Sequence, residues 1–407
     1  MPSVRPITNA NLGVNPDWPS LPLFNRKGWK RLPFGAFADS VNERVDPANA
    51  GEDIYVGLDG LDSGSLHIRR WGKGSDVIGT KLCFRKGDII FGRRRAYQRK
   101  LVVAEMEGIC SAHAMVVRAK PEVVLPEFLP FLMMSDKFMS RAVEISVGSL
   151  SPTINWTTLR LQEFDLPPLD QQRRIAEIFW AVDEVLQHYR KVKLEAITYR
   201  DSFAINCFKG KSPRQNSTLG DACSMIRDGT HLPPPRTKEG PLLLGVTNIV
   251  QGRLILTEGD TRVSESFYDK MHQSWRIEPC DVLLAIVGAT IGKTAQVPKE
   301  FPRFTVQRSV AVLRGRDGIL RNDFLRYFLA SKIGQRRIWA KVNQTAQPGV
   351  YLGELSRIAI PLLTLKEQEA MCSEFAAAKD VEIEAEEHGV RTASLLANLT
   401  NTILLDT

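Results

Sequence analysis

The sequence predicts an α+β protein of two similar domains that are separated and followed by long helices, which together form an antiparallel coiled coil. Three observations predict this fold: one unit of about 196 residues occurs twice, short strand-like runs alternate with turn residues, and two long stretches carry apolar residues at helical spacing. A chain of 407 residues also exceeds what a single core usually supports, roughly 250 to 300 residues. We therefore expect a pseudo-two-fold internal repeat.

The repeat rests on residues that match at one spacing. A shift of 196 positions aligns Phe128 with Phe324, Ser135 with Ser331, Pro152 with Pro348, Leu159 with Leu355, Gln172 with Gln368 and Phe179 with Phe375. Upstream the shift falls to 193, where Asp88 meets Asp281. Such drift indicates loop insertions in the early part of each unit, while the later part keeps one length.

Each unit begins with a mixed part in which short β-branched or apolar runs are bounded by Gly, Pro and Asp clusters. The runs are 88–91, 101–104 and 113–118 in the first unit and 281–287 and 309–313 in the second, with helices expected at 127–134 and 323–331. The expected organisation is an N-terminal arm at 1–27, a first domain at 28–168, a central helix at 169–212, a second domain at 213–363 and a closing helix at 364–407.

The two long helices are marked by their starts and by their apolar seams. The first follows Pro167 and Pro168, and the second opens with a capping box between Thr364 and Glu367. The first carries a 3-then-4 seam formed by Ile175, Ile178, Val182, Val185, Tyr189, Val192, Tyr199 and Phe203. We expect the two helices to pair within the chain, and the alternative is that each packs on its own domain.

Charge and composition favour an anionic partner. Lys and Arg number 54 against 46 Asp and Glu, which gives a net charge of +8 and a pI near 9.2. No run of 18 uncharged apolar residues and no signal-peptide pattern occurs, so a cytoplasmic protein without membrane contact is expected. The six cysteines are scattered and lack metal-ligand spacing, which predicts reduced thiols and no metal site.

Motifs for catalysis fail on inspection. The stretch Val287–Thr294 resembles a phosphate loop, but only three residues separate Gly288 from Gly292 where the loop needs four. Asn15-Pro16-Asp17-Trp18 lacks the second proline of an amino-methylating motif. Zinc-protease helices, nucleophile elbows and paired-carboxylate nuclease signatures are not found either. A binding protein that is not an enzyme and holds no cofactor of its own is therefore favoured.

The densest basic stretch is Arg85 to Lys100, where Tyr97 and Gln98 stand among arginines that can contact phosphates or guanine edges. A solvated loop is the alternative for this stretch, and a buried structural role is the alternative for His231. The DNA-binding candidates are Arg69, Arg70, Lys73, Arg93, Arg94, Arg95, Tyr97, Gln98, Arg99 and Lys100 in the first domain, and Arg227, Thr230, His231, Arg236, Lys238, Lys293, Arg303, Gln307 and Arg308 in the second.

Two repeated phrases carry a family resemblance. Asp165-Leu166-Pro167-Pro168-Leu169-Asp170-Gln171-Gln172 recurs as Ile360-Pro361-Leu362-Leu363-Thr364-Leu365-Lys366-Glu367-Gln368, and Asp228-Gly229-Thr230-His231, Asp88 and Asp281 add further motif positions. Over nearly its whole length the chain resembles the specificity subunit of a type I restriction-modification system. In the second unit, Leu363 and Thr364 depart from the Pro167-Pro168 pattern.

The resemblance implies two target recognition domains that each read one half of a bipartite double-stranded DNA target. It also implies that two modification subunits dock on the helices and methylate adenine, and that restriction subunits translocate and cleave the DNA. S-adenosylmethionine, ATP and Mg would then be bound by those partners, and this chain would catalyse nothing. Two classes compete with this interpretation: an enzyme with unfamiliar motifs, and a coiled-coil assembly protein without a DNA role.

A length estimate is compatible with a split DNA target. The first long helix, taken as 170–206, would span about 55 Å at roughly 1.5 Å per residue. Half-sites on one face of DNA lie about 34 Å apart for each helical turn. We therefore expect the helices to set the gap between the two half-sites.

Overall fold

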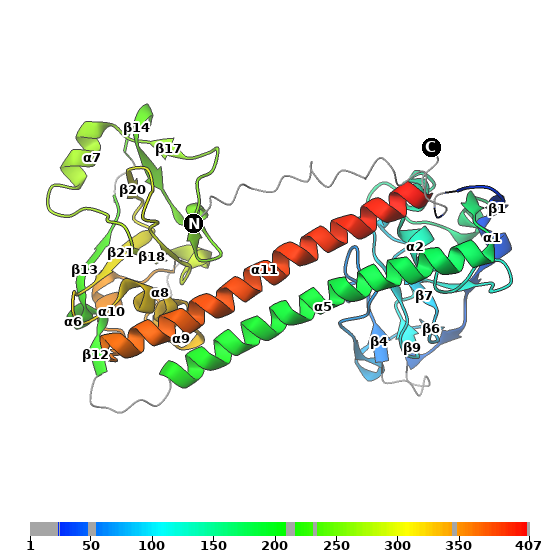
Figure 1. Cartoon of the computed structure of the whole chain (residues 1–407), viewed down its shortest axis with the longest axis horizontal. Coiled ribbons are helices and arrows are strands. Elements are labelled where there is room, and N and C mark those ends of the chain that lie inside the picture. Colours follow the sequence, from blue (N-terminus) through cyan, green and yellow to red (C-terminus); the bar gives the residue numbers. More distant parts are fainter. Residues whose placement is uncertain are drawn as a thin grey trace. The chain divides into compact units, whose positions relative to one another are not determined.

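The computed structural model describes residues 23, 25–47, 54–208, 216–230, 234–343 and 348–404. The chain divides into two compact units, of which unit 1 is Met1–Tyr189 with Glu387–Thr407 and unit 2 is Arg190–Glu386. Each unit therefore contains one α+β domain and a segment of each long helix (Figure 1). Most of the predicted N-terminal arm lies outside the described residues.

The described residues of unit 1 form three small sheets, in the orders β1-β11, β2-β10-β7-β8 and β3-β6-β9-β4-β5. Phe34, Phe91, Phe138 and Phe164 lie in a core to which the start of helix α5 and the end of helix α11 also contribute. The elements are β1 Lys30–Pro33, α1 Phe34–Phe37, β2 Ala38–Val41, β3 Arg44–Val45, β4 Ile54–Val56, β5 Gly72–Lys73, η5 Gly74–Asp76, β6 Lys81–Phe84, β7 Ile89–Phe91, η6 Ala96–Gln98, β8 Leu101–Val103, β9 Gly108–Cys110, β10 Met115–Ala119, α2 Leu129–Met134, α3 Asp136–Glu144, α4 Trp156–Leu159, β11 Glu163–Leu166, α5 Leu169–Phe208 and α11 Leu365–Leu404.

Unit 2 is built on the same plan, with sheets in the orders β12-β22, β13-β21-β18-β19-β16-β15 and β17-β14-β20. Its core gathers Phe208, Phe324, Phe328 and Phe375. The elements are β12 Asn216–Thr218, α6 Leu219–Ala222, β13 Cys223–Asp228, β14 Thr237–Leu244, η8 Val246–Asn248, β15 Ile249–Val250, β16 Arg253–Leu254, β17 Thr261–Arg262, α7 Glu265–Met271, β18 Val282–Ala285, η9 Gly288–Thr290, β19 Thr294–Gln296, β20 Phe304–Val306, β21 Val310–Gly315, α8 Asn322–Ala330, α9 Lys332–Trp339, α10 Leu352–Ser356 and β22 Ala359–Pro361.

The predicted duplication is confirmed by the topology of the two domains. The antiparallel strand order β2-β10-β7-β8 in unit 1 has its equivalent in β13-β21-β18-β19 of unit 2. The pairs β1–β11 and β12–β22 are likewise both antiparallel. Parallel pairs occur in both domains as well: β4 pairs with β9 in unit 1, and in unit 2 β14 pairs with β20 and β16 with β19. The predicted α+β fold is therefore present twice.

One glutamine makes the same three hydrogen bonds in each unit where the domain joins its helix. Gln172 accepts from the Leu125 amide (2.8 Å) and donates to the carbonyls of Val123 (3.0 Å) and Pro167 (2.9 Å). Gln368 accepts from the Arg321 amide (2.9 Å) and donates to the carbonyls of Ile319 (2.8 Å) and Leu363 (2.9 Å). All six backbone partners match at the shift of 196, so the repeat holds down to single hydrogen bonds.

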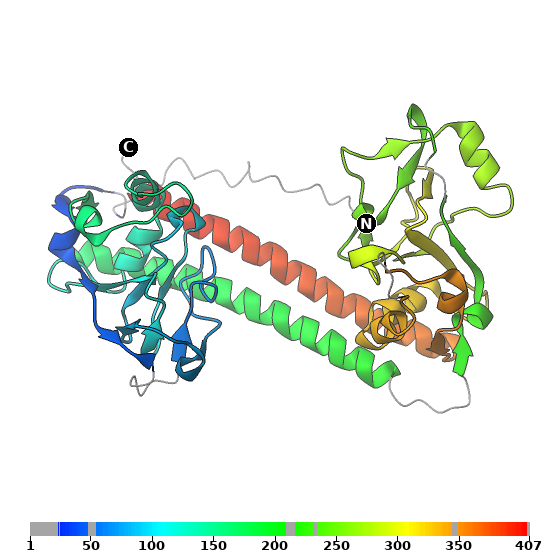
Figure 2. The same cartoon turned by 180° about the vertical axis from the view of Figure 1, so that it is seen from behind.

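The long helices pair in antiparallel fashion, as predicted. In unit 1 the Tyr189 ring stacks on His388 at 5.1 Å, and in unit 2 Lys193 lies 2.9 Å from Glu386 and Phe203 contacts Phe375. The end of α5 and the start of α11 thus belong to unit 2, as the view from behind shows (Figure 2). Each helix also packs on the domain cores. The alternative that the helices pack on the domains is therefore correct in addition to the predicted helix pairing.

The predicted capping box is confirmed at the start of α11. The Thr364 amide donates to the Glu367 carboxylate (2.9 Å), and the Glu367 amide donates to the Thr364 hydroxyl (3.3 Å).

Among the described residues, no helix is long and apolar enough to span a membrane.

The predicted seam of the first helix is correct in part. Ile175 is buried, and Val182, Tyr189, Val192 and Phe203 are half-buried. Ile178, Val185 and Tyr199, however, are exposed at 39%, 47% and 51%. The buried positions that the prediction missed include Phe179 and Leu186.

The physical reason for this correction lies in the domain core. Phe179 packs edge-on against Phe131 at 5.0 Å, so the first turns of α5 turn their buried face toward the domain as well as toward α11. A two-helix seam therefore describes only part of what α5 buries.

Candidate functional site

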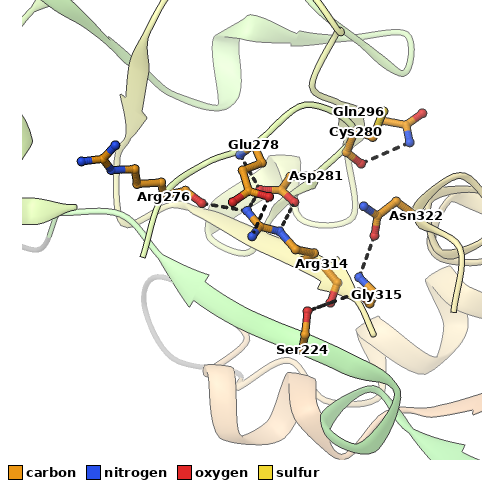
Figure 3. Close-up of polar contacts among 9 residues, drawn as sticks. All are labelled: Ser224, Arg276, Glu278, Cys280, Asp281, Gln296, Arg314, Gly315 and Asn322. Carbon is orange, nitrogen blue, oxygen red and sulfur yellow. Dashed lines mark hydrogen bonds and ion pairs between the residues drawn. The ribbon is translucent and has the colours of Figure 1, made fainter. Parts of the chain in front are cut away.

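A buried carboxylate–guanidinium pair fixes the sheet of unit 2 beside its surface loops (Figure 3). Asp281 is fully buried just before β18, and Arg314 on β21 donates to both of its carboxylate oxygens, from Nε at 2.7 Å and from a terminal nitrogen at 2.8 Å. Arg314 also lies 2.9 Å from Glu278 and donates to the Arg276 carbonyl at 2.8 Å. Because these carboxylates hold the charged form, the pKa of Arg314 is raised.

Unit 1 repeats this pair with Asp88 and Arg118. Arg118 reaches both oxygens of the buried Asp88 at 2.7 Å, and the Asp88 hydrogen bond raises the pKa of Arg118. In each unit a backbone amide three residues earlier, that of Arg85 or of Glu278, also donates to the aspartate at 2.8 Å. Each pair therefore joins two neighbouring strands of its sheet, and the loops next to these strands start from a backbone that is held in place.

The loop that follows β7 carries Arg93, Arg94 and Arg95 and is fastened along its backbone. The Ile154 amide donates to the Arg93 carbonyl (3.0 Å), and the Arg95 amide donates to the Pro152 carbonyl (2.8 Å). Arg95 has a left-handed φ of 56°, and the buried Ala96 follows it. The side chains of Arg94 and Arg95 are consequently exposed on a backbone that is held in place.

Arg93 lies near other positive charges, and no carboxylate contributes to the shift of its pKa. Desolvation lowers the pKa of Arg93 first, and the charges of Arg94 and Arg44 lower it further. The pKa of His113 is likewise lowered by desolvation and then by Arg94, Arg93 and Lys81. Within the described part of the chain, the Arg93 Nε is buried and has no hydrogen-bond partner. An anion at this point would relieve the repulsion.

Other predicted residues of unit 1 are engaged inside the protein. Arg99 donates to the Met134 carbonyl (2.7 Å) and pairs with Asp136, and Lys100 donates to the Leu58 carbonyl (2.8 Å). Arg70 bonds to Asp62 and Arg69 to Gln187. Lys73 on β5 and Tyr97 are exposed, and Gln98 is half-buried. The structure thus brings Arg93, Arg94 and Arg95 together and gives Arg99 and Lys100 a role in holding the loop.

In unit 2 the DNA-binding candidate Thr230, which follows β13, meets the connection between β20 and β21. Thr230 bridges to Gln307 along the backbone, and the Arg308 amide donates to the Thr230 carbonyl at 3.2 Å. A Cβ on Gly229 would lie 1.7 Å from the Val306 carbonyl oxygen, so only glycine fits at this crossing. Gln307 also packs against Gly245, a neighbour that no sequence pattern could identify.

The remaining candidates of unit 2 are more dispersed. Arg303 pairs with Glu265 at 2.6 Å and lies over the Tyr268 ring, which accounts for its charge. His231 lies outside the described residues. The side chains of the following candidates are exposed: Arg227, Arg236, Lys238, Lys293 and Arg308.

Each of the six cysteine side chains is buried or half-buried. None of the six cysteines, all of which lie among the described residues, forms a disulfide, and burial raises the pKa of Cys110, Cys223 and Cys372 to about 12. Across the described ranges, no group of three or more His, Cys, Asp or Glu side chains is arranged to hold a metal ion.

Comparison with known proteins gives a consistent result. Residues 47–197 match the model of the type I restriction modification DNA specificity domain. The type I restriction enzyme EcoDI specificity subunit of Escherichia coli is 24% identical over 214 residues, which cover 49% of this chain and 45% of that protein. The match therefore spans less than half the length of this relative.

Two solved structures share the fold. The type I restriction-modification S subunit from M. genitalium has a TM-score of 0.59 at 15% identity and covers 95% of this chain and 99% of its own. A chain from a study of complex assembly and conformational transition of the type I R-M system has a TM-score of 0.56 at 21% identity, with coverages of 93% and 99%.

Proposed function

We propose, on the premise that this chain is related to the specificity subunits of type I restriction-modification systems, that it binds double-stranded DNA sequence-specifically through its two domains. Each domain would read one half of a bipartite target. The duplicated fold supports two separate contacts with DNA, and the differing loops of the two domains support two different half-sites.

The observation that carries this proposal is the cluster of like charges around Arg93. Desolvation and neighbouring cations both lower the pKa of Arg93, so the cluster is electrostatically unfavourable by itself. A DNA phosphate supplies the missing negative charge, and guanidinium groups bind phosphate and guanine edges in a forked geometry. The exposed Tyr97 beside the loop adds a flat ring that could contact a sugar or a base.

The second contact would come from Thr230, Gln307 and Arg308. An amide such as that of Gln307 can form paired hydrogen bonds to adenine, whereas arginine favours guanine. Since unit 1 offers arginines and unit 2 offers a mixed amide, hydroxyl and guanidinium set, the two half-sites should differ in sequence.

We also propose that the chain is a non-catalytic scaffold for two modification subunits and for restriction subunits. S-adenosylmethionine, ATP and Mg would be held by those partners. Exposed apolar side chains along the helices support a docking role, among them Val185 (47%), Leu194 (64%) and Val390 (57%). Methyl transfer or cleavage by the isolated chain would contradict the non-catalytic part.

DNA binding can be tested with a double variant of the full chain, Arg93→Ala with Arg94→Ala. Each lost phosphate contact should reduce the slope of log affinity against log salt by about 0.9, so the double variant should bind more weakly and with a shallower slope. Arg141→Ala is the matched control, because this exposed arginine of the same unit is paired with Glu144 at 2.7 Å. Equal affinity and slope in the double variant and the control would contradict the proposed site.

A further inference from the structure

His67 is held between two carboxylates that come from different parts of unit 1. Its Nδ1 lies 2.6 Å from Glu105 Oε1, and its Nε2 lies 2.6 Å from Asp183 Oδ2. The rings of Trp180 and His67 pack in a T-shaped arrangement with 6.2 Å between centroids. Asp183 is buried, and Glu105 is half exposed. The imidazole therefore has a carboxylate at each nitrogen.

These two contacts determine the protonation state of the ring. A neutral imidazole carries one N–H and can donate to only one carboxylate, which leaves a lone pair facing the other. The imidazolium donates at both nitrogens and neutralises charge on both sides. Consistent with this geometry, the Asp183 hydrogen bond and then that of Glu105 raise the pKa of His67 against the effect of burial.

The contact joins the domain to the helix. His67 lies in the connection between β4 and β5, Glu105 follows β8, and Asp183 lies on α5. The neighbouring Arg69 donates to Gln187 at 2.9 Å, and Gln187 donates to Asp183 at 3.2 Å, which adds a second link between the same loop and α5. Arg69 also lies 3.7 Å from Asp62 on its own loop.

We propose that His67 is a protonation-dependent positioning residue, whose imidazolium fastens the 61–70 loop and the β8–β9 connection of unit 1 to α5. The contact is complete when the ring carries both protons. Deprotonation removes one donor and leaves a carboxylate unpaired against the ring, so the loop separates from the helix more readily.

The direction of the pH dependence follows from the raised pKa. A histidine whose folded pKa lies above its ordinary value of 6.5 contributes stability that is fully present below that value. The contribution is lost as pH rises through the folded pKa. The charged groups that act on the ring are Asp183 from α5 and Glu105 from the β8–β9 connection, with Arg69 and Asp62 beside it on the loop.

Unit 2 provides an internal comparison. Asp183 aligns with Lys379 at the shift of 196, and Lys379 instead pairs with Glu382 at 2.8 Å on its own helix. The histidine contact is therefore not repeated at this position of α11. For DNA, a consequence that rests on the proposed function, alkaline pH should weaken binding of the half-site read by unit 1 more than that read by unit 2.

Amide hydrogen exchange of the full chain between pH 6.5 and 9 tests the inference without DNA. In the native protein, the protection factors of residues 66–69 should fall by about tenfold per pH unit until the folded pKa is passed. His67→Gln should abolish this dependence, whereas His67→Arg, which keeps a charge and several donors, should retain protection at pH 9. Amides of β18 and β21 in unit 2 serve as the control. Their protection factors should be the same in the native chain and in both variants.

The inference is overturned if the native loop shows the same protection at both ends of the pH range, or if His67→Gln titrates like the native protein. A second measurement holds even if the variants fail to fold. The ¹⁵N shifts of the native His67 ring should show both nitrogens protonated below a pKa that lies above the ordinary 6.5, and a ring that titrates at or below this ordinary value would refute the proposal. A chain that passes these tests but binds no DNA would contradict only the proposed function.

Discussion

Arg118 and Arg314 show why a charged residue must be judged by its partners. Both arginines stand in basic, strand-forming sequence, yet each forks to a buried aspartate. The sequence marked Asp88 and Asp281 as motif positions, but their arginines lie about 30 residues further on and across a strand pair, at a distance that local pattern cannot bridge. Removing one partner of such a pair leaves an unpaired buried charge.

Arg314→Met should therefore destabilise unit 2 by about 3 kcal/mol, because Asp281 loses its counter-charge while it stays fully buried. Hydrogen exchange of β18 and β21 measures the loss. Arg118→Met is the matched variant and should weaken β7 and β10 of unit 1 instead. If Arg314→Met left the exchange of β18 and β21 unchanged, the pair would not hold the sheet.

Buried thiols give a second prediction for single residues. The pKa of Cys110 and Cys223 is about 12 against an ordinary 9.0, so the thiolate at pH 8 should be about a thousandfold scarcer than in an exposed cysteine. Both should resist iodoacetamide in the folded chain, while the half-buried Cys280 serves as the comparison. Mass spectrometry measures the rate of alkylation at each cysteine. If Cys110 reacted as fast as Cys280, the assigned burial would be contradicted.

The basic stretch Arg85 to Lys100 shows the limit of charge counting. Its density indicated an anion-binding loop, and the like-charge surroundings of Arg93 support that hypothesis. The sequence could not separate Arg93 from Arg99, because the Arg99 partners, the Met134 carbonyl and Asp136, come from distant positions in the chain. Candidate residues therefore follow from composition, whereas their roles need the fold.

Among the elements, the long helices were the most predictable. The apolar repeat and the capping box located α5 and α11, whose observed ranges are Leu169–Phe208 and Leu365–Leu404. The exact buried face was less predictable because α5 contacts both α11 and its own domain. Ile178 and Val185 fit the helical repeat but are exposed, while Phe179 is buried against Phe131.

The glutamine junctions give a prediction at the scale of elements. Gln172→Ala removes three hydrogen bonds and leaves the amide of Leu125 without its side-chain acceptor, which should cost about 2 kcal/mol in the stability of unit 1. Gln368→Ala should have the same effect on unit 2, because its bonds are equivalent. Urea unfolding, monitored by hydrogen exchange in each unit separately, measures the free energy of unfolding that each of the two variants loses. Markedly different losses would show that the junctions are not energetically equivalent.

For the whole molecule, duplication explains how one scaffold can serve two sites. The strand order and the junction bonds repeat, and so do the backbone contacts of the loop after β7. The bonds from the Ile154 amide to the Arg93 carbonyl and from the Arg95 amide to the Pro152 carbonyl have their equivalents, after β18, in Val350 to Ile286 and Gly288 to Pro348. The side chains differ, because Ile286, Val287 and Gly288 stand where the first unit has Arg93, Arg94 and Arg95. Residue matches at shifts of 196 and 193 predicted the duplication. The backbone contacts of these loops were not predictable, since they join segments such as Arg93–Arg95 and Pro152–Ile154 that are distant in sequence.

The proposal that the helices set the gap between half-sites can be tested by lengthening both. Seven residues inserted near Lys191 and seven near Glu386, about two helical turns, keep the phase of the apolar seam and with it the antiparallel pairing around Lys193 and Glu386. The permitted gap between half-sites should change while each half-site stays the same. Insertion near Lys191 alone is the comparison that disturbs the pairing. An unchanged gap after the matched insertion would exclude the helices as the spacer.

Selection of bound duplexes from a random library, with the full chain in complex with its modification subunit, tests the central claim most directly. The account predicts enrichment of two short, different motifs at a constant gap. It also predicts that Arg93→Ala with Arg94→Ala relaxes one motif and leaves the other intact. Enrichment of a single continuous motif, or no enrichment above the library, would contradict a chain that reads DNA at two sites.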